Sequence, residues 1–214
     1  MKKFLTLALL LSVTTFSFAQ KDPKAKVLLD GVSNKFKTYK TVSANFVYQV
    51  QNAAGKVLAK KNGVISMKGS KYNIALGGNK IISDGATVWN YDPAAKEVTV
   101  SDANNAASTI TPQKLFTNFY EKDFNYTLGS VKKVGAKTVQ EVVLKPTDTR
   151  KPFSRVHLLI DKATNTMASA EVYEKSGNKY VYTISSLKPN AAVSDAQFAF
   201  NKAAYPGVEI VDLR

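Results

Sequence analysis

A tight hairpin near the middle of the chain constrains its fold more than any other feature. Asp84-Gly85 is a turn signal, because both residues tolerate a positive φ and apolar or β-branched residues flank them. After the turn, the side chains of residues 87–91 alternate, which places Trp89 and Tyr91 on the same face of a strand. The stretch therefore predicts a β-hairpin that presents aromatic side chains on one side.

Strand-like alternation recurs along most of the chain. Strands at this spacing are typical of an antiparallel sheet, and so many strands in one sheet must curl or split to avoid a long exposed edge. We therefore expect a mainly β fold with helices (α+β), in which the antiparallel sheet curls into an incomplete, half-closed β-barrel. The expected strands lie around residues 45–50, 57–61, 63–67, 72–76, 81–82, 98–100, 124–134, 138–145, 154–161, 167–174 and 180–184.

Two helices are expected to cover this sheet. Residues 25–39 carry apolar side chains at helical spacing, although Gly31 lowers the helix propensity of this segment. Thr111-Pro112 is typical of a helix start, with threonine as the N-cap and proline at the first helical position. The short helix after it would present an apolar lid made of Leu115, Phe116 and Phe119.

The first 19 residues have the pattern of a secretory signal peptide. Lys2 and Lys3 precede an apolar segment, residues 4–13, that is too short to span a bilayer comfortably. Ser17-Phe18-Ala19 then matches the small-x-small pattern of a cleavage site. We expect a cleaved signal peptide over residues 1–19, a single domain over residues 20–214 and a periplasmic location. An uncleaved membrane anchor is the alternative.

The chain is strongly basic, with 30 lysines and arginines against 16 acidic residues and a formal net charge of +14. Such a charge favours acidic surfaces, namely anionic lipid head groups, lipopolysaccharide or nucleic acid. Because export is expected, we exclude nucleic acid as a partner. The lysines are scattered along the chain, so a solvated surface that keeps the protein soluble is the alternative explanation.

Residues typical of catalysis or metal binding are scarce. The chain has no cysteine and one histidine, His157, which lies inside an expected strand and outside any catalytic motif. The common zinc ligand sets therefore cannot be assembled, and nucleotide-binding or nucleophile-elbow motifs do not occur. Asp84 and Asp92 are interpreted as turn residues. We predict no enzyme activity, cofactor or metal site, although sequence alone leaves a carboxylate-only hydrolase open.

The hairpin and several other blocks resemble one known family. Residues 83–93 are similar to the SDG-x-T-[LV]-W-x-Y-[ND]-P stretch of the LolA family, whose members are periplasmic carriers of outer-membrane lipoproteins. The order and spacing of the blocks carry the resemblance over most of the mature chain. The other blocks are residues 42–49, 63–68, 111–119, 196–200 and 206–212.

The resemblance implies a binding function without catalysis. It implies an apolar cavity for the acyl chains of lipoproteins, loading by an inner-membrane ABC-type exporter, a possible outer-membrane acceptor and a monomeric carrier. Each wall residue could also be plain core. A lipid-sensing or regulatory module of the same half-barrel, a carrier of other lipids and a lipid-modifying enzyme stay open as alternatives. The expected cavity wall is Phe46, Tyr48, Ile65, Met67, Tyr72, Ile74, Trp89 and Tyr91, with Leu115, Phe116 and Phe119 on the lid.

One position departs from the family pattern. In the strand that corresponds to residues 63–68, the family often has an arginine directly after the lysine. That arginine is linked to lid contacts and to cargo transfer. Here that position is Gly69. Lys68 or Lys71 could supply a nearby charge, but neither has the bidentate geometry of arginine. We therefore assign no transfer role to Gly69.

Overall fold

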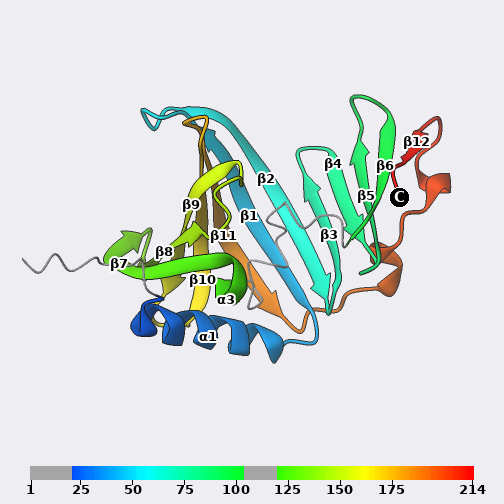
Figure 1. Cartoon of the computed structure of the whole chain (residues 1–214). Coiled ribbons are helices and arrows are strands. Elements are labelled where there is room, and N and C mark those ends of the chain that lie inside the picture. Colours follow the sequence, from blue (N-terminus) through cyan, green and yellow to red (C-terminus); the bar gives the residue numbers. More distant parts are fainter. Residues whose placement is uncertain (1–20, 104–119) are drawn as a thin grey trace, which may run out of the picture.

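The protein is built around one strongly curled sheet of twelve strands, which stays open rather than closing into a full barrel (Figure 1). The computed structural model describes residues 21–103 and 120–214. The strand order is β12-β6-β5-β4-β3-β2-β1-β11-β10-β9-β8-β7, and every neighbouring pair is antiparallel except β12 and β6. The predicted mainly β fold with an incomplete barrel is confirmed.

One half of the sheet curls around the N-terminal helix α1, Pro23–Lys37 (Figure 1). Asp22 caps this helix, because its carboxylate accepts hydrogen bonds from the backbone N–H groups of Lys24 and Ala25. The short helix α3, Tyr120–Asp123, joins α1 through the Tyr120 hydroxyl, which donates to Asp30 at 2.6 Å. The strands of this half are β1 Val42–Gln51, β7 Phe124–Val134, β8 Lys137–Pro146, β9 Phe153–Asp161, β10 Thr166–Glu174 and β11 Lys179–Pro189.

The other half extends the sheet away from α1 (Figure 1). Its strands are β2 Val57–Lys68, β3 Lys71–Leu76, β4 Asn79–Ser83, β5 Thr87–Asp92, β6 Glu97–Asp102 and β12 Glu209–Asp212. The C-terminal tail, residues 190–214, contains the 3-10 turns Asp195–Phe198 and Lys202–Ala204 before it ends with β12. The tail thus adds a parallel strand to the edge that β6 would otherwise leave open.

The structure differs from the expected strands at two places. Residues 57–61 and 63–67 belong to one strand, because the alternation continues through Asn62 without a turn. The sheet is also not purely antiparallel, since β12 returns from a distant part of the chain to pair with β6. The expected lid helix, residues 111–119, lies outside the described residues.

The hairpin predicted at Asp84-Gly85 joins β4 and β5. The Asp84 carboxylate accepts hydrogen bonds from the N–H groups of Ala86 at 2.9 Å and Thr87 at 2.7 Å. Gly85 has a φ of +98°, a conformation that favours glycine. Asp84 is therefore a turn residue, as its position in the sequence indicates.

The main core fills the inner face of the sheet, by which we mean the face that α1 covers. Leu29 of α1 packs among side chains of β7–β10 that are almost fully buried, such as Tyr126, Leu144 and Val156. Gly31 allows α1 to approach the turn between β9 and β10, because a Cβ there would lie 2.6 Å from Asn165 Nδ2. Close packing against Asn165 thus explains why α1 contains Gly31 despite the low helix propensity of glycine.

Candidate functional site

Six of the eight residues predicted for the cavity wall lie on the inner face. Strand register aligns Ile65 with Ala44 on β1 and with Ile74 on β3, and it aligns Met67 with Tyr72. Ile65, Met67, Tyr72 and Ile74 are only 2–5% exposed and belong to the same core as α1. These four side chains therefore form the filled floor of the inner face.

The other two, Phe46 and Tyr48, lie further along β1 and are only half-buried. They meet aromatic side chains of β11, because Phe46 aligns with Ile184 and Tyr48 with Tyr182. The ring centroids of Tyr48 and Tyr182 are 5.2 Å apart, and those of Phe46 and Tyr182 are 6.3 Å apart. This end of the inner face thus carries an aromatic cluster that the core does not fully enclose.

Burial raises the pKa of the Tyr182 hydroxyl well above its ordinary value. Burial likewise raises the pKa of Tyr48, and the neighbouring Tyr180 adds to this shift. Both groups therefore stay neutral at physiological pH and offer apolar ring surface.

Half-buried aliphatic side chains continue this surface on both sides. We call the set the upper inner face, and its members share the same side of the sheet by register. The alternation of Tyr180, Tyr182 and Ile184 predicts a strand. Their position opposite β1 could not be predicted from it, because that pairing is a long-range contact. The upper inner face comprises Phe46, Tyr48, Leu76, Ile81, Tyr180, Tyr182 and Ile184.

Trp89 and Tyr91 do not share this face, so the expectation that they line the same cavity wall is corrected. Across β4 and β5, Trp89 aligns with Ile82 and Asn90 aligns with Ile81. Since Ile81 aligns with Ile74, Trp89 points to the outer face, opposite α1. There the two aromatics pack with Val98, Val100 and Val208, and with Phe200 and Tyr205 of the tail.

Gly63 shapes the inner face next to Phe46. The two residues align across β1 and β2, and a Cβ on Gly63 would lie 2.3 Å from the tip of the Phe46 ring. The ring therefore lies flat across the glycine backbone, where any side chain would displace it.

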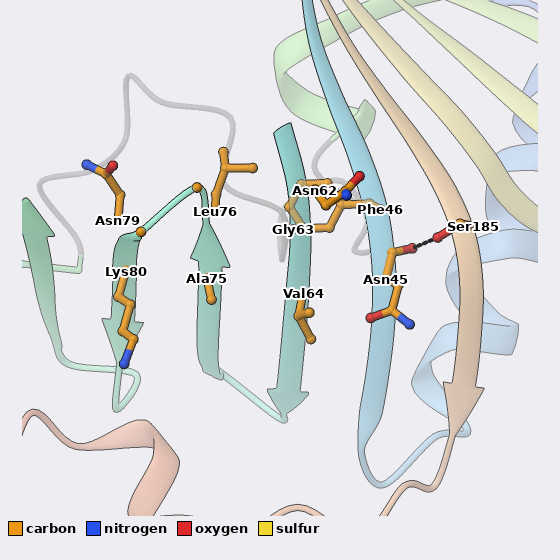
Figure 2. Close-up of a pocket in the computed structure, with 12 residues that line it drawn as sticks. Asn45, Phe46, Asn62, Gly63, Val64, Ala75, Leu76, Asn79, Lys80 and Ser185 are labelled. Atoms are coloured by element: carbon orange, nitrogen blue, oxygen red, sulfur yellow. Dashed lines mark hydrogen bonds between the residues drawn. The ribbon is translucent and has the colours of Figure 1, made fainter. Parts of the chain in front are cut away.

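A groove of about 520 Å³ crosses β1, β2 and the turn between β3 and β4 (Figure 2). Its size lies within the ~300–1,000 Å³ of ordinary ligand sites. Its lining has two rows by register. Asn45, Val64, Ala75 and Lys80 lie on the outer face, whereas Phe46, Gly63, Leu76 and Asn79 lie on the inner face. Phe46 and Leu76 belong to both the groove and the upper inner face, so the apolar part of the groove continues that face, while the asparagine amides make the rest of the groove polar.

A polar network occupies the outer face of the first half. The buried carboxylate of Glu141 contacts Lys132 Nζ at 2.5 Å and His157 Nδ1 at 2.8 Å. Arg155 Nε donates to His157 Nε2 at 3.2 Å, so the histidine proton sits on Nδ1 and is donated to Glu141. Burial opposes the charge of Glu141, but the hydrogen bonds from Lys132 and His157 outweigh it and lower the carboxyl pKa. His157 thus has a clear structural role.

The lysines considered as substitutes for the family arginine lie close to the tail. Lys68 Nζ contacts Asp195 at 2.9 Å, and Lys71 Nζ reaches the same carboxylate at 4.0 Å. Asn73 Nδ2 donates to the carbonyl of Gln197 at 2.6 Å. Lys68 therefore forms an exposed ion pair with the tail. The predicted lid residues Leu115, Phe116 and Phe119 lie outside the described residues.

The described ranges contain neither a metal-ligand cluster nor a membrane-spanning helix. Across residues 21–103 and 120–214, the acidic and histidine side chains form no group of three suited to a metal ion. In the same two ranges, none of the helices is long and apolar enough to cross a membrane.

Comparison with known proteins identifies the family of this chain. The family model described as outer membrane lipoprotein carrier protein LolA matches residues 37–201. The chain belongs to the LolA family. The resemblance seen in the sequence blocks is thereby confirmed.

Individual LolA relatives match over nearly their whole length. The outer-membrane lipoprotein carrier protein of Histophilus somni (strain 2336) is 26% identical over 220 residues, covering 100% of this chain and 99% of that protein. The protein of the same description from Glaesserella parasuis serovar 5 (strain SH0165) is 28% identical, covering 100% and 97%. An uncharacterized conserved protein from Thermus thermophilus has a TM-score of 0.58 at 14% identity, covering 88% of this chain and 99% of that one. That structural likeness shows the fold alone.

Proposed function

We propose that this protein binds the acyl chains of lipoproteins on its upper inner face and carries them from the inner to the outer membrane. The observation that carries the proposal is the set of half-buried aromatic and aliphatic side chains on the inner face of an open, curled sheet. Membership of the LolA family, with relatives named lipoprotein carriers, supports the same cargo.

The physical need for such a carrier is simple. Each buried methylene of an acyl chain contributes ~0.8 kcal/mol, so unassisted passage of a lipoprotein through water is very slow. A carrier needs an apolar surface that holds the chains moderately, and it needs no catalytic group. We therefore propose that the protein acts by binding rather than by catalysis.

The rest of the cycle follows from this role. The mature protein, released from the signal peptide over residues 1–19, would work as a monomer in the periplasm. It would receive cargo from an ABC-type exporter in the inner membrane and pass it on at the outer membrane, to an acceptor if one exists. The lid of this carrier would be residues 111–119.

The direct test is release of cargo from membranes. Purified mature protein is added to inner membranes that contain the exporter, ATP and an acylated lipoprotein, and the soluble fraction is analysed by gel filtration. We expect a water-soluble complex, and we expect none when the acylated cysteine of the cargo is replaced by serine. Cargo that stays in the membrane at every protein concentration would overturn the proposal.

A matched pair of variants locates the site. Phe46→Ser removes the ring at the centre of the upper inner face, whereas Val64→Ser removes an apolar side chain that is 45% exposed on the outer face. We expect Phe46→Ser to weaken binding of a fluorescent fatty acid by roughly tenfold, since a buried aromatic ring contributes ~1.5–3 kcal/mol. Val64→Ser should bind the fatty acid as the wild type does. An equal loss of affinity in both variants would show that the upper inner face is not the binding site.

A further inference from the structure

The hairpin between β1 and β2 carries a surface that acyl binding on the upper inner face leaves unused. Its turn is tight, with Asn52 N–H donating to the Lys56 carbonyl at 3.0 Å and Gly55 at a φ of +80°. Beyond the turn, β2 pairs with β3 only from Gly63 onward. Residues 57–62 therefore have β1 on one side and, within the described part of the chain, no strand on the other.

This segment stands out from the sheet. α1 leads into the start of β1, so the turn lies at the far end of that strand (Figure 1). We call residues 52–62 the hairpin tip. Its length and its single neighbouring strand leave it accessible to a large flat partner.

Two large apolar side chains of the hairpin tip are exposed to water. Val57 is 46% exposed and Leu58 is 55% exposed. They lie at a break in the ladder, because Val50 pairs with Ala59 but Gln51 pairs with Val57, which leaves Leu58 without a partner residue on β1. Neither the core nor a described neighbouring element covers them.

The same segment is purely basic. The hairpin tip contains Lys56, Lys60 and Lys61, all exposed, and no acidic residue. No ion pair to any of the three exists among residues 21–103 and 120–214. Unpaired lysine charge beside exposed apolar surface is the combination that anionic lipid head groups attract.

A neighbouring turn adds to this charge. A Cβ on Gly177 would lie 3.7 Å from the Cβ of Ala53, so the turn between β10 and β11 lies beside the hairpin tip. That turn brings the exposed Lys175 to the same end. Glu174 lies next to it, and its carboxylate accepts a hydrogen bond from the Ser176 hydroxyl at 2.8 Å. The positive charge is thus in excess at this end.

We propose that the hairpin tip docks the protein on the surface of an anionic lipid bilayer. Val57 and Leu58 enter the boundary between head groups and acyl chains, while the lysines stay at the level of the phosphates. This inference rests on the proposed function in one respect, since a lipoprotein carrier must approach membranes to collect and release its cargo. The docking itself follows from the exposed residues.

A bilayer fits these residues better than a protein partner does. Protein interfaces are enriched in tyrosine, tryptophan and arginine and depleted in lysine. The hairpin tip has three lysines and none of those anchors.

The test is flotation of the mature protein with lipid vesicles. We expect binding to vesicles that contain phosphatidylglycerol, weaker binding to phosphatidylcholine alone, and loss of the difference in high salt. Val57→Ser/Leu58→Ser and Lys56→Gln/Lys60→Gln should each lower the partition coefficient on anionic vesicles by about tenfold. Because all four side chains are exposed, urea unfolding should confirm that both variants fold as the wild type does.

Matched controls carry the same chemical change elsewhere. Val27→Ser alters a 73% exposed valine on α1, and Lys137→Gln/Lys162→Gln removes two exposed charges at the other end of β9 and β10. These variants should bind vesicles as the wild type does. Equal binding by tip variants and wild type, or equal losses in tip and control variants, would overturn the proposal.

Two further outcomes separate the alternatives. A wild-type dimer in gel filtration that the tip variants lose, without vesicle binding, would make the unpaired edge of β2 a contact between copies and overturn membrane docking. Uptake of a fluorescent fatty acid is measured on the same samples. Tip variants that keep this uptake but lose vesicle binding support the proposal, whereas a wild type without uptake would contradict only the carrier function.

Discussion

The two halves of the sheet use their faces in opposite ways. In the half formed by β7–β10, the inner face is a closed core under α1 and the outer face carries the ion pairs of Glu141. In the other half, β5 and β6 carry a core on the outer face, built by Trp89, Tyr91 and the C-terminal tail. The inner core also takes in Tyr72 and Ile74 of β3, so the dependence on the outer core is strongest at β5 and β6.

This difference explains how the inner face can stay available to a ligand. Beyond Ile74, the inner side chains Leu76 and Ile81 are only half-buried. A sheet usually needs one covered apolar face to be stable, and here the tail supplies that cover on the opposite side. This end of the inner face can therefore accept a ligand, and its residues Phe46, Ile81 and Ile184 also pack against the edge of the main core.

The largest expected effect falls in the first half. Leu144 is fully buried on β8 in the core under α1, so Leu144→Ala should lower the free energy of unfolding by about 3 kcal/mol. Leu76→Ala, on the upper inner face, is the matched control and should cost less than about 1 kcal/mol while it weakens fatty-acid binding. Urea unfolding and fluorescence titration check both values. Equal destabilisation by the two variants would contradict the distinction between the tightly packed core under α1 and the half-buried upper inner face.

The next largest effect tests the outer core of the second half. Trp89→Ala removes a half-buried ring that packs with Val100 and the tail, and it should lower the free energy of unfolding by about 2 kcal/mol. Because this ring points away from the upper inner face, fatty-acid affinity of the folded variant should not change. A variant of normal stability that no longer binds fatty acid would contradict this placement and show that Trp89 lines the binding cavity.

Local features of the sequence were sufficient for the elements themselves. The Asp84-Gly85 turn, the alternation in β7–β11 and the apolar stripe of α1 each act within a few residues, so they could be predicted. The floor of the inner face, including Ile65 and Met67, followed from the same alternation. The half-closed barrel could be predicted because so many strands cannot stay flat.

The relative phase of neighbouring strands could not be predicted in the same way. Ile74 and Trp89 both belong to alternating strands, but a shift of one residue in either intervening turn would exchange their faces. The observed alignment of Ile82 with Trp89 is fixed by the turns and by the tail, which packs from more than a hundred residues away in sequence. The pairing of Tyr48 with Tyr182 and the parallel strand β12 depend on similar long-range contacts.

A smaller effect is expected from the polar network of the first half. Glu141→Gln removes a buried charge that Lys132 and His157 stabilise, and at pH 7 it should lower the free energy of unfolding by about 1–2 kcal/mol. The carboxyl pKa of Glu141 is lowered by folding, so its stabilising contribution is present above the unfolded value of 4.5 and is lost as pH falls through the folded pKa. The difference between wild type and variant should therefore shrink as urea unfolding is repeated at decreasing pH. A difference that stays constant down to about pH 3 would show that charge is not its cause.

The smallest effect is expected where an ion pair joins the second half to the tail. Asp195 contacts Lys68 at 2.9 Å, almost the distance of the Glu141–His157 contact, but its side chain is 61% exposed. Lys68 lowers the pKa of the Asp195 carboxyl, yet water and salt screen an exposed pair, so Asp195→Asn should leave the midpoint of urea unfolding unchanged within error. Comparison with Glu141→Gln under the same conditions separates burial from distance as the source of stability. A loss as large as that of Glu141→Gln would mean that the tail is held by this charge rather than by the packing of Phe200, Tyr205 and Val208, and the outer core of the second half would then depend on electrostatics.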